Sequence, residues 1–246
     1  MADIKILGNV FNGVSKLNLQ NASGGGTTEF SAGGGDFDLK SYIAGSIASI
    51  TIPSDQTIIR GGAFEGCTNI TSINLPDTLI SIGRNAFYNC QNLTNVKCNG
   101  AISGFETGVF NCPSSASKLV TARFPYLTGT VNAAFGSSTT SNACKLLELV
   151  DCGNASKLGS NAFANCTALH ILILRSNTLC TLDTINALAG TQFRGSSVTG
   201  GVVYVPSALI SAYQTTGYWK TYYDDGDCTF SALENSPYAN PDFVLS

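Results

Sequence analysis

The chain has 246 residues, of which 43% are hydrophobic and 12% are charged, and its net charge is −3 at neutral pH. Because soluble domains carry roughly 25% charged residues, this apolar, weakly acidic composition excludes a disordered segment and a basic nucleic-acid footprint. The surface must be built from Ser, Thr, Asn and Gly, which is typical of β-rich binding and structural proteins.

The first 36 residues are expected to form a small β element followed by a glycine-rich arm. Residues 4–11 alternate loosely between apolar and polar side chains, and Asn12-Gly13 is a strong hairpin signal. The candidates for the return strand are Val14, Leu17 and Leu19. Glycine runs at 24–26 and 33–35 predict a hinge or extended arm. They lack the spacing of nucleotide-binding loops, so no phosphate site is expected there.

A 23-residue repeat governs the middle of the chain. Ile50-Thr51-Ile52-Pro53 recurs as Ile73-Asn74-Leu75-Pro76, and Ala63-Phe64-Glu65-Gly66-Cys67 recurs as Ala86-Phe87-Tyr88-Asn89-Cys90, each pair 23 positions apart. Looser copies continue as far as Pro206. Together they predict seven short strands, centred on Thr51, Asn74, Lys97, Arg123, Asp151, Ile173 and Tyr204.

Each repeat contributes one strand and one set of interior side chains. Since strand side chains alternate, the middle residue of each strand is expected to point outward and its apolar neighbours inward. Stacked copies then bury one continuous core, with an interior ladder that includes Phe64, Cys67, Phe87, Cys90, Phe163 and Cys166. In the third copy Cys112 comes one place early, and no matching Cys follows Phe135 in the fourth.

Residues 82–93, Ile-Gly-Arg-Asn-Ala-Phe-Tyr-Asn-Cys-Gln-Asn-Leu, resemble the BspA-like leucine-rich repeat signature I-G-x-x-A-F-x-x-C-x-x-L. The resemblance covers about residues 47–206. It implies a curved α/β-type solenoid with a β-sheet face and no intrinsic catalysis, in a family of mostly surface-exposed binding proteins. We therefore expect three parts: the β element and arm over 1–36, the solenoid over 37–206, and a cap with a tail over 207–246.

The segment after Pro206 is expected to close the solenoid with a short helix. Ser207 is a candidate N-cap, and apolar side chains follow at helical spacing at Leu209, Ala212, Tyr213 and Trp219. This segment resembles the end of repeat proteins that include phage-encoded ones, and residues 1–36 resemble the start of small phage structural proteins. Residues 1–5 show no secretory signal pattern.

These resemblances imply a bacteriophage virion protein: a capsid decoration, a head fibre or a tail-associated component. A bacterial cell-surface adhesin of the same repeat family is the alternative. The expected partners are other virion proteins, contacted through the N-terminal region, and a glycan or protein of the host surface. The chain is expected to act as a homo-oligomer or in many copies, with neither a nucleic-acid partner nor a membrane span. Its best apolar run, 168–174, is far shorter than the roughly 18–20 residues that a span needs.

The candidate binding face is the outward row of strand residues, since a solenoid sheet presents an extended binding surface. The row consists of Thr51, Asn74, Lys97, Arg123, Asp151, Ile173 and Tyr204. A solvated or self-associating face is the other interpretation. If the protein is multimeric, Ile173 and Tyr204 are candidates for burial between copies.

No catalytic residue, cofactor or metal site is expected. Nine cysteines are an odd number, which fits free thiols packed as small hydrophobic side chains. The single histidine, His170, has no partner that the sequence fixes for acid–base catalysis. Asp224, Asp225 and Asp227 do not match EF-hand spacing, so a solvated acidic loop is expected there rather than a calcium site.

Overall fold

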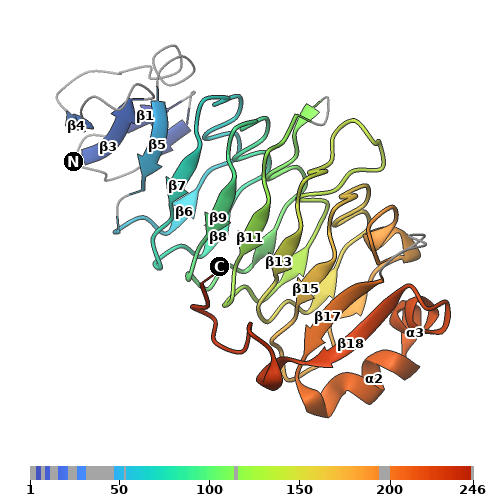
Figure 1. Ribbon diagram of the computed structural model, residues 1–246. Coiled ribbons are helices and arrows are strands. Elements are labelled where there is room, and N and C mark those ends of the chain that lie inside the picture. Colours follow the sequence, from blue (N-terminus) through green and yellow to red (C-terminus); the bar gives the residue numbers. More distant parts are fainter. Residues whose placement is uncertain are drawn as a thin grey trace.

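The protein is a solenoid of short strands that form two sheets along its length (Figure 1). The computed structural model describes residues 4–6, 9–11, 16–21, 27–31, 47–52, 54–113, 116–193 and 200–244. The larger sheet has ten strands in the order β18-β17-β15-β13-β11-β9-β7-β5-β3-β4. The smaller has six, in the order β16-β14-β12-β10-β8-β6. Within the described residues, no helix has the length and apolar character needed to cross a bilayer.

The seven predicted strands form the centre of the larger sheet, which confirms the leucine-rich-repeat solenoid. They are β5 (Ile47–Thr51), β7 (Ser72–Asn74), β9 (Asn95–Lys97), β11 (Thr121–Arg123), β13 (Leu149–Asp151), β15 (Ile171–Ile173) and β17 (Gly201–Val205). All pair in parallel, so equivalent positions of successive repeats stand side by side. At the C-terminal edge, β18 (Cys228–Ala232) adds a further parallel strand to β17.

The smaller sheet was not predicted from the repeat. It is built from two-residue strands: β6 (Ile58–Ile59), β8 (Ser81–Ile82), β10 (Gly104–Phe105), β12 (Thr130–Val131), β14 (Lys157–Leu158) and β16 (Thr181–Leu182). The second residue of each is buried. These side chains join the inward residues of the larger sheet in one continuous hydrophobic core.

A column of phenylalanine rings runs through this core. Phe64 stacks on Phe87 and Phe87 on Phe110, both with 5.3 Å between ring centroids. The column continues through Phe135, at 5.0 Å from Phe110, to Phe163 at 5.5 Å. Each ring therefore packs against the ring of the neighbouring coil, which links consecutive repeats in the way that solenoid stability requires.

Cysteine thiols accompany the rings and bond to the preceding coil. The Sγ of Cys90 donates to the Phe64 carbonyl at 3.2 Å, and the Sγ of Cys166 donates to the Phe135 carbonyl at 3.4 Å. In the fourth copy, which lacks a Cys three residues after Phe135, Cys144 takes this place and donates to the Phe110 carbonyl at 3.1 Å. Its backbone N–H also bonds to Phe135 O, as Cys67 N–H does to Phe64 O. The insertion thus preserves the interior ladder.

All nine thiols are free and buried. Burial raises the pKa of Cys98 to about 11 and the pKa of Cys67, Cys144, Cys180 and Cys228 to about 12. The pKa values of Cys90, Cys112, Cys152 and Cys166 are raised for the same main reason. The thiols are therefore protonated near neutral pH and act as core side chains.

Asparagine and glycine share the left-handed turn positions of the repeat. Gly62 and Asn85 occupy one such position with φ of 68° and 57°, and Gly66 and Asn89 occupy another with φ of 76° and 61°. Asn165, also left-handed, donates from Nδ2 to the Ser137 carbonyl at 2.8 Å. Because other side chains are disfavoured there, these turns account for part of the high Gly and Asn content.

The N-terminal β element pairs differently from the prediction. β1 (Ile4–Ile6) pairs antiparallel with β2 (Asn9–Phe11), so the segment that was expected to be one strand contains two. The predicted return strand is β3 (Lys16–Asn21), which instead pairs antiparallel with β5 and with β4 (Thr27–Ser31). β4 lies in the segment that was expected to be an arm. Asn12-Gly13, Val14 and both glycine runs lie outside the described residues.

The C-terminal cap contains η3 (Ser207–Leu209), α2 (Ile210–Thr215) and α3 (Gly217–Asp224), and η4 (Leu233–Asn235) begins the segment after β18. Figure 1 shows α2 and α3 at the end of the solenoid beside β18. Buried Trp219 donates from Nε1 to the Cys180 carbonyl at 2.6 Å, and the Tyr213 hydroxyl accepts from Cys180 N–H at 2.9 Å. Tyr222 donates to the carbonyl of Ile185, which begins η2 (Ile185–Leu188), at 2.5 Å. The cap thus satisfies backbone groups of the last coil.

The assignment of Ser207 as an N-cap was wrong. It is the first residue of η3, and no side chain caps α2. Its backbone N–H donates to both carboxylate oxygens of Glu234 at 3.1 Å. A carboxylate from a later segment therefore satisfies the donor that a local cap would have satisfied.

Candidate binding face on the ten-stranded sheet

The outward row of the larger sheet is in register along seven strands. Arg123 lies opposite Lys97 and Asp151, and Ile173 lies opposite Asp151 and Tyr204. Thr51 lies opposite Asn74 at the N-terminal side. The residues predicted for the candidate face therefore share one line across the sheet.

The row was predicted as an exposed surface, but its residues differ in their exposure to solvent. Thr51 and Asn74 are exposed, and Lys97, Arg123 and Tyr204 are half-buried. Asp151 and Ile173 are each 0% exposed. Both residues belong to the outward row and not to the main core, so another part of the chain must cover them on the outer side of the sheet.

The cover is the C-terminal segment 233–244, named here the tail. It follows β18 and runs back over the outer side of the sheet (Figure 1), so that Pro241 and Asp242 contact β11 and β9. A small hydrophobic cluster forms beneath it, with Leu149 and Ile173 from the sheet and Leu233 and Phe243 from the tail. This second cluster lies on the opposite side of the sheet from the main core.

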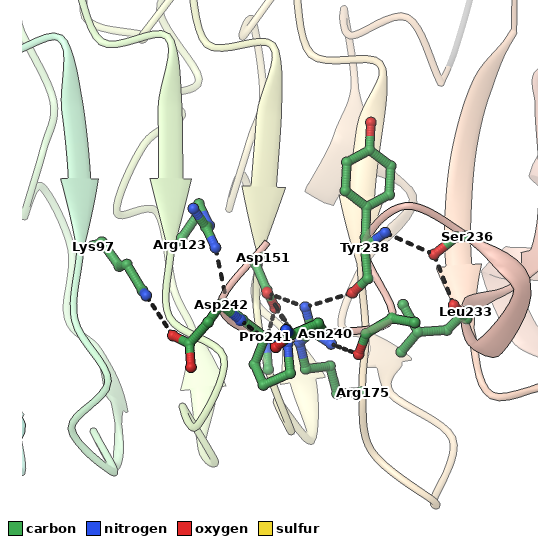
Figure 2. A network of polar contacts seen from close by, with 12 residues as sticks. Lys97, Arg123, Asp151, Arg175, Leu233, Ser236, Tyr238, Asn240, Pro241 and Asp242 are labelled. Atoms are coloured by element: carbon green, nitrogen blue, oxygen red, sulfur yellow. Dashed lines mark hydrogen bonds and ion pairs between the residues drawn. The ribbon is translucent and has the colours of Figure 1, made fainter. Parts of the chain in front are cut away.

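Three cationic side chains of the solenoid hold the tail (Figure 2). Lys97 Nζ lies 2.6 Å from Asp242 Oδ1, and Arg123 Nη2 donates to the Pro241 carbonyl at 2.9 Å. Arg175, two residues after β15, donates from Nη2 to the Tyr238 carbonyl at 3.0 Å. The contacts are spaced along the tail and come from the coils of β9, β11 and β15, which fixes its direction over the sheet.

Arg175 also forms a buried ion pair with Asp151. Its Nε and Nη2 reach the two carboxylate oxygens at 2.6 to 3.1 Å, and Gly153 N–H donates to the same carboxylate at 3.0 Å. The Arg175 side chain is 10% exposed and that of Asp151 is 0% exposed. Burial raises the pKa of Asp151, and the hydrogen bonds and charge of Arg175 oppose that rise.

Aromatic contacts also hold the tail against the sheet. Tyr204 and Tyr238 meet edge to face with centroids 4.9 Å apart, and Tyr238 meets Phe243 in the same way at 5.0 Å. The guanidinium carbon of Arg123 lies 3.7 Å from the centroid of the Phe243 ring. Cations and rings of the sheet therefore contact rings and carbonyl groups of the tail.

A groove of about 580 Å³ remains open beside the end of the tail. Its lining comes from β7, β9, the turns after them and β11, with Asp242, Phe243 and Val244 of the tail along one side. The polar side chains that line it are Asn74, Asp77, Asn95, Lys97, Asn99, Thr121, Arg123 and Asp242. A smaller hollow of about 280 Å³ lies on the six-stranded sheet, with Ser81, Ser103, Glu106 and Asn132 in its lining.

The groups considered for catalysis and metal binding lie elsewhere. His170 is exposed, and its Nδ1 lies 2.9 Å from the carbonyl oxygen of Ala168. Asp224 pairs with Lys220 on the surface of α3. Among the described residues, no group of three or more His, Cys, Asp or Glu side chains is arranged to hold a metal ion.

Sequence reasoning missed Arg175 and the tail residues that it holds. Arg175 directly follows the strand pattern at Leu174, where an isolated charge in a chain with 12% charged residues was the available signal. The tail residues Tyr238, Pro241, Asp242 and Phe243 have no counterpart in the repeat. Their place over β9, β11 and β15 comes from tertiary contacts alone.

Comparison with known proteins agrees with this architecture. Residues 39–170 match the BspA type leucine rich repeat region in six copies. Curated proteins give no match. Since the matched region covers more than half of the chain and the described strands follow the same repeat, the chain belongs to the BspA-type leucine-rich repeat family.

Proposed function

We propose that the chain is a non-enzymatic binding protein that recognises a macromolecular partner through the outer side of the ten-stranded sheet. Leucine-rich repeat families are generally non-enzymatic, and the repeat domain suggests a protein-binding or adhesin-like role. The observation that carries the proposal is the open groove of about 580 Å³ beside the tail. It lies on the sheet side where repeat proteins commonly present an extended binding surface.

The chemistry of the groove suits a polar ligand. Asn74 and Asn95 are exposed amides on neighbouring strands. The Asn95 amide donates to Thr94 Oγ1 at 3.1 Å and accepts from Thr121 Oγ1 at 2.7 Å, which leaves it one further N–H and one further lone pair for an incoming group. Asn99 contributes an amide oxygen that is buried and has no hydrogen-bond partner within the described part of the chain. A ligand that donates a hydrogen bond to this oxygen would satisfy it.

The experiment uses a variant that blocks the groove, Asn74→Arg with Asn95→Arg, beside the wild-type chain. A matched control places two arginines on the other sheet, at Ser81 and Ser103. Each labelled protein is cross-linked to intact bacterial cells, and the captured host proteins and glycans are identified by mass spectrometry. We expect a partner that the wild type and the control capture and the groove variant loses. Capture that survives in the groove variant and disappears in the control would assign binding to the six-stranded sheet and contradict the proposal.

We further propose that the solenoid is displayed on a bacteriophage particle, as a capsid decoration, head fibre or tail-associated component, in several copies. In this proposal residues 1–36 attach the chain to other virion proteins and residues 37–206 present the binding face to a host-surface glycan or protein. The support is the resemblance of residues 1–36 to the start of small phage structural proteins, and of the segment after Pro206 to the end of repeat proteins that include phage-encoded ones. Mass spectrometry of purified particles tests it. Detection on the bacterial envelope with absence from particles would favour the cell-surface adhesin instead.

A further inference from the structure

We propose that the tail-covered part of the sheet is itself a peptide-binding site, and that the tail occupies it in place of an external peptide. The external ligand is an extended segment of a protein partner in which an acidic residue is followed directly by an aromatic one. The inference rests on the proposed binding role of the sheet and adds the chemistry of the ligand. Its starting point is the way in which Asp242 and Phe243 are held.

Half of the recognition is directed at the peptide backbone. Arg123 donates to the carbonyl of Pro241, and Arg175 donates to the carbonyls of Tyr238 and Ala239 at 3.0 and 3.2 Å. Every peptide segment carries such carbonyl groups, so these bonds do not depend on the identity of the tail. The site can therefore accept an extended segment from another protein.

The other half depends on side chains and defines the ligand. Lys97 pairs with the Asp242 carboxylate, and the guanidinium of Arg123 lies over the Phe243 ring. The ring of Tyr204 receives Tyr238 four residues before the acid. A ligand with an aromatic residue, three intervening residues, an acid and a second aromatic residue would repeat these contacts.

The charge of the site favours an acidic ligand. Lys97, Arg123 and Arg175 contribute three positive charges beneath the tail, and Asp151 contributes one negative charge that Arg175 neutralises. If the tail leaves, Lys97 and Arg123 lose the nearby negative charge of Asp242. Electrostatic complementarity then selects a segment that supplies one.

Two of the contacts at the end of the tail leave room for a better ligand. The Lys97–Asp242 pair is largely open to solvent, with side chains 37% and 61% exposed, and exposed ion pairs contribute little. Arg123 Nε is buried without a hydrogen-bond acceptor in the described structure, so the tail leaves one donor of the site unsatisfied. An external segment that supplies an acceptor at this point gains a bond that the tail does not make.

The experiment measures binding of a fluorescein-labelled peptide with the sequence of residues 236–244 to the full-length chain, by fluorescence anisotropy. A tail variant, Tyr238→Ala with Asp242→Ala and Phe243→Ala, weakens the internal competitor. A matched control carries Tyr218→Ala, Tyr223→Ala and Asp55→Ala, which are exposed changes of the same kind away from the face. Circular dichroism of each protein establishes that it is folded.

We expect the tail variant to bind the peptide at least about tenfold more tightly than the wild type or the control, because a tethered competitor has a high effective concentration. Adding Arg123→Ala to the tail variant should weaken binding by about fivefold or more through loss of the cation–π contact. A peptide with Asp and Phe changed to Ala should bind correspondingly less well.

Three outcomes would overturn the inference: no binding to a folded tail variant, equal binding to the wild type and the tail variant, or binding that Arg123→Ala leaves unchanged. If the triple variant does not fold, the single variant Phe243→Ala must show the same gain over the wild type. Blocking of the open groove by Asn74→Arg and Asn95→Arg is scored separately. If the groove variant loses its partner and the tail variant does not bind the peptide, the proposed function stands and the peptide site is rejected.

Discussion

Arg175 donates to both carboxylate oxygens of Asp151 and, with the same guanidinium group, donates to the carbonyls of Tyr238 and Ala239. One side chain thus joins the sheet to the segment that crosses it. Because the Asp151 side chain is fully buried, the pair is shielded from solvent screening, unlike the exposed Lys97–Asp242 pair. Arg175 therefore connects the carbonyl groups of the tail to a buried ion pair of the solenoid.

Replacing Arg175 with Met should lower the free energy of unfolding by about 3–5 kcal/mol, because the variant leaves the Asp151 carboxylate buried and unpaired. Urea denaturation at pH 7 measures the loss. The pKa of Asp151 should rise further in the variant, since burial would act without the arginine. Stability from a raised carboxyl pKa is present at low pH and is lost as the pH rises through that pKa. The variant should therefore be less impaired near pH 4 than at pH 7.

The double variant Arg175→Met with Asp151→Asn is the control for this prediction. The Asn amide oxygen can still accept from Gly153 N–H, and no buried charge remains. Most of the lost stability should return, and the difference between pH 4 and pH 7 should disappear. A double variant as unstable as the single one would show that Arg175 acts through packing or the tail carbonyls rather than through Asp151.

The carboxyl pKa of Asp242 should lie below its ordinary value of 3.8, because Lys97 donates to the carboxylate and lies close to it as a positive charge. Because the pKa is lowered in the folded protein, the ion pair stabilises the docked tail above about pH 3.8. This stabilisation is lost as the pH falls through the lowered pKa. Carbon-detected NMR titration of Asp242 gives the midpoint, which should return toward 3.8 in Lys97→Gln. An unchanged midpoint in that variant would contradict the pair.

The seven central strands could be predicted because the repeat fixes both their spacing and their inward residues. Ile50 and Ile73 recur at one interval, so a single alternation argument locates every outward position from Thr51 to Tyr204. The same argument could not reveal the smaller sheet, since strands such as Ile58–Ile59 are too short to show a period of two. The ladder position of Cys144 could not be predicted because an insertion displaces this residue to nine positions after Phe135. Its place in the structure is nevertheless that of the repeat cysteine.

The candidate site was predictable only in its sheet half. Lys97, Arg123 and Asp151 stood out as charges on the outward row, and the structure places all three beside one another or under the tail. Their partners in the tail lie 118 and 145 positions away from Arg123 and Lys97. No local periodicity relates segments so distant, and the burial of Asp151 and Ile173 depends on that long-range contact.

Phe87→Ala should destabilise the solenoid by about 3–5 kcal/mol, because it removes a buried ring from the middle of the stacked column. Phe87→Leu should cost less, since most of the apolar volume remains. Tyr218→Ala, at a position 43% exposed on the cap, is the matched control and should change stability by no more than about 0.5 kcal/mol. Equal losses in Phe87→Ala and Tyr218→Ala during urea denaturation would contradict the structural importance of the column.

The nine thiols should react very slowly with Ellman's reagent in the native protein at pH 8 and promptly after denaturation. The Cys98 thiol, with its pKa raised to about 11, would be thiolate in only about one molecule in a thousand at pH 8, and burial further restricts access to all nine thiols. A Tyr126→Cys variant supplies the control, since Tyr126 is 44% exposed and the added thiol should react at once. A native thiol of the wild type that reacted as fast as the added one would show a cysteine outside the inert core, and would reopen the question of thiol chemistry in this chain.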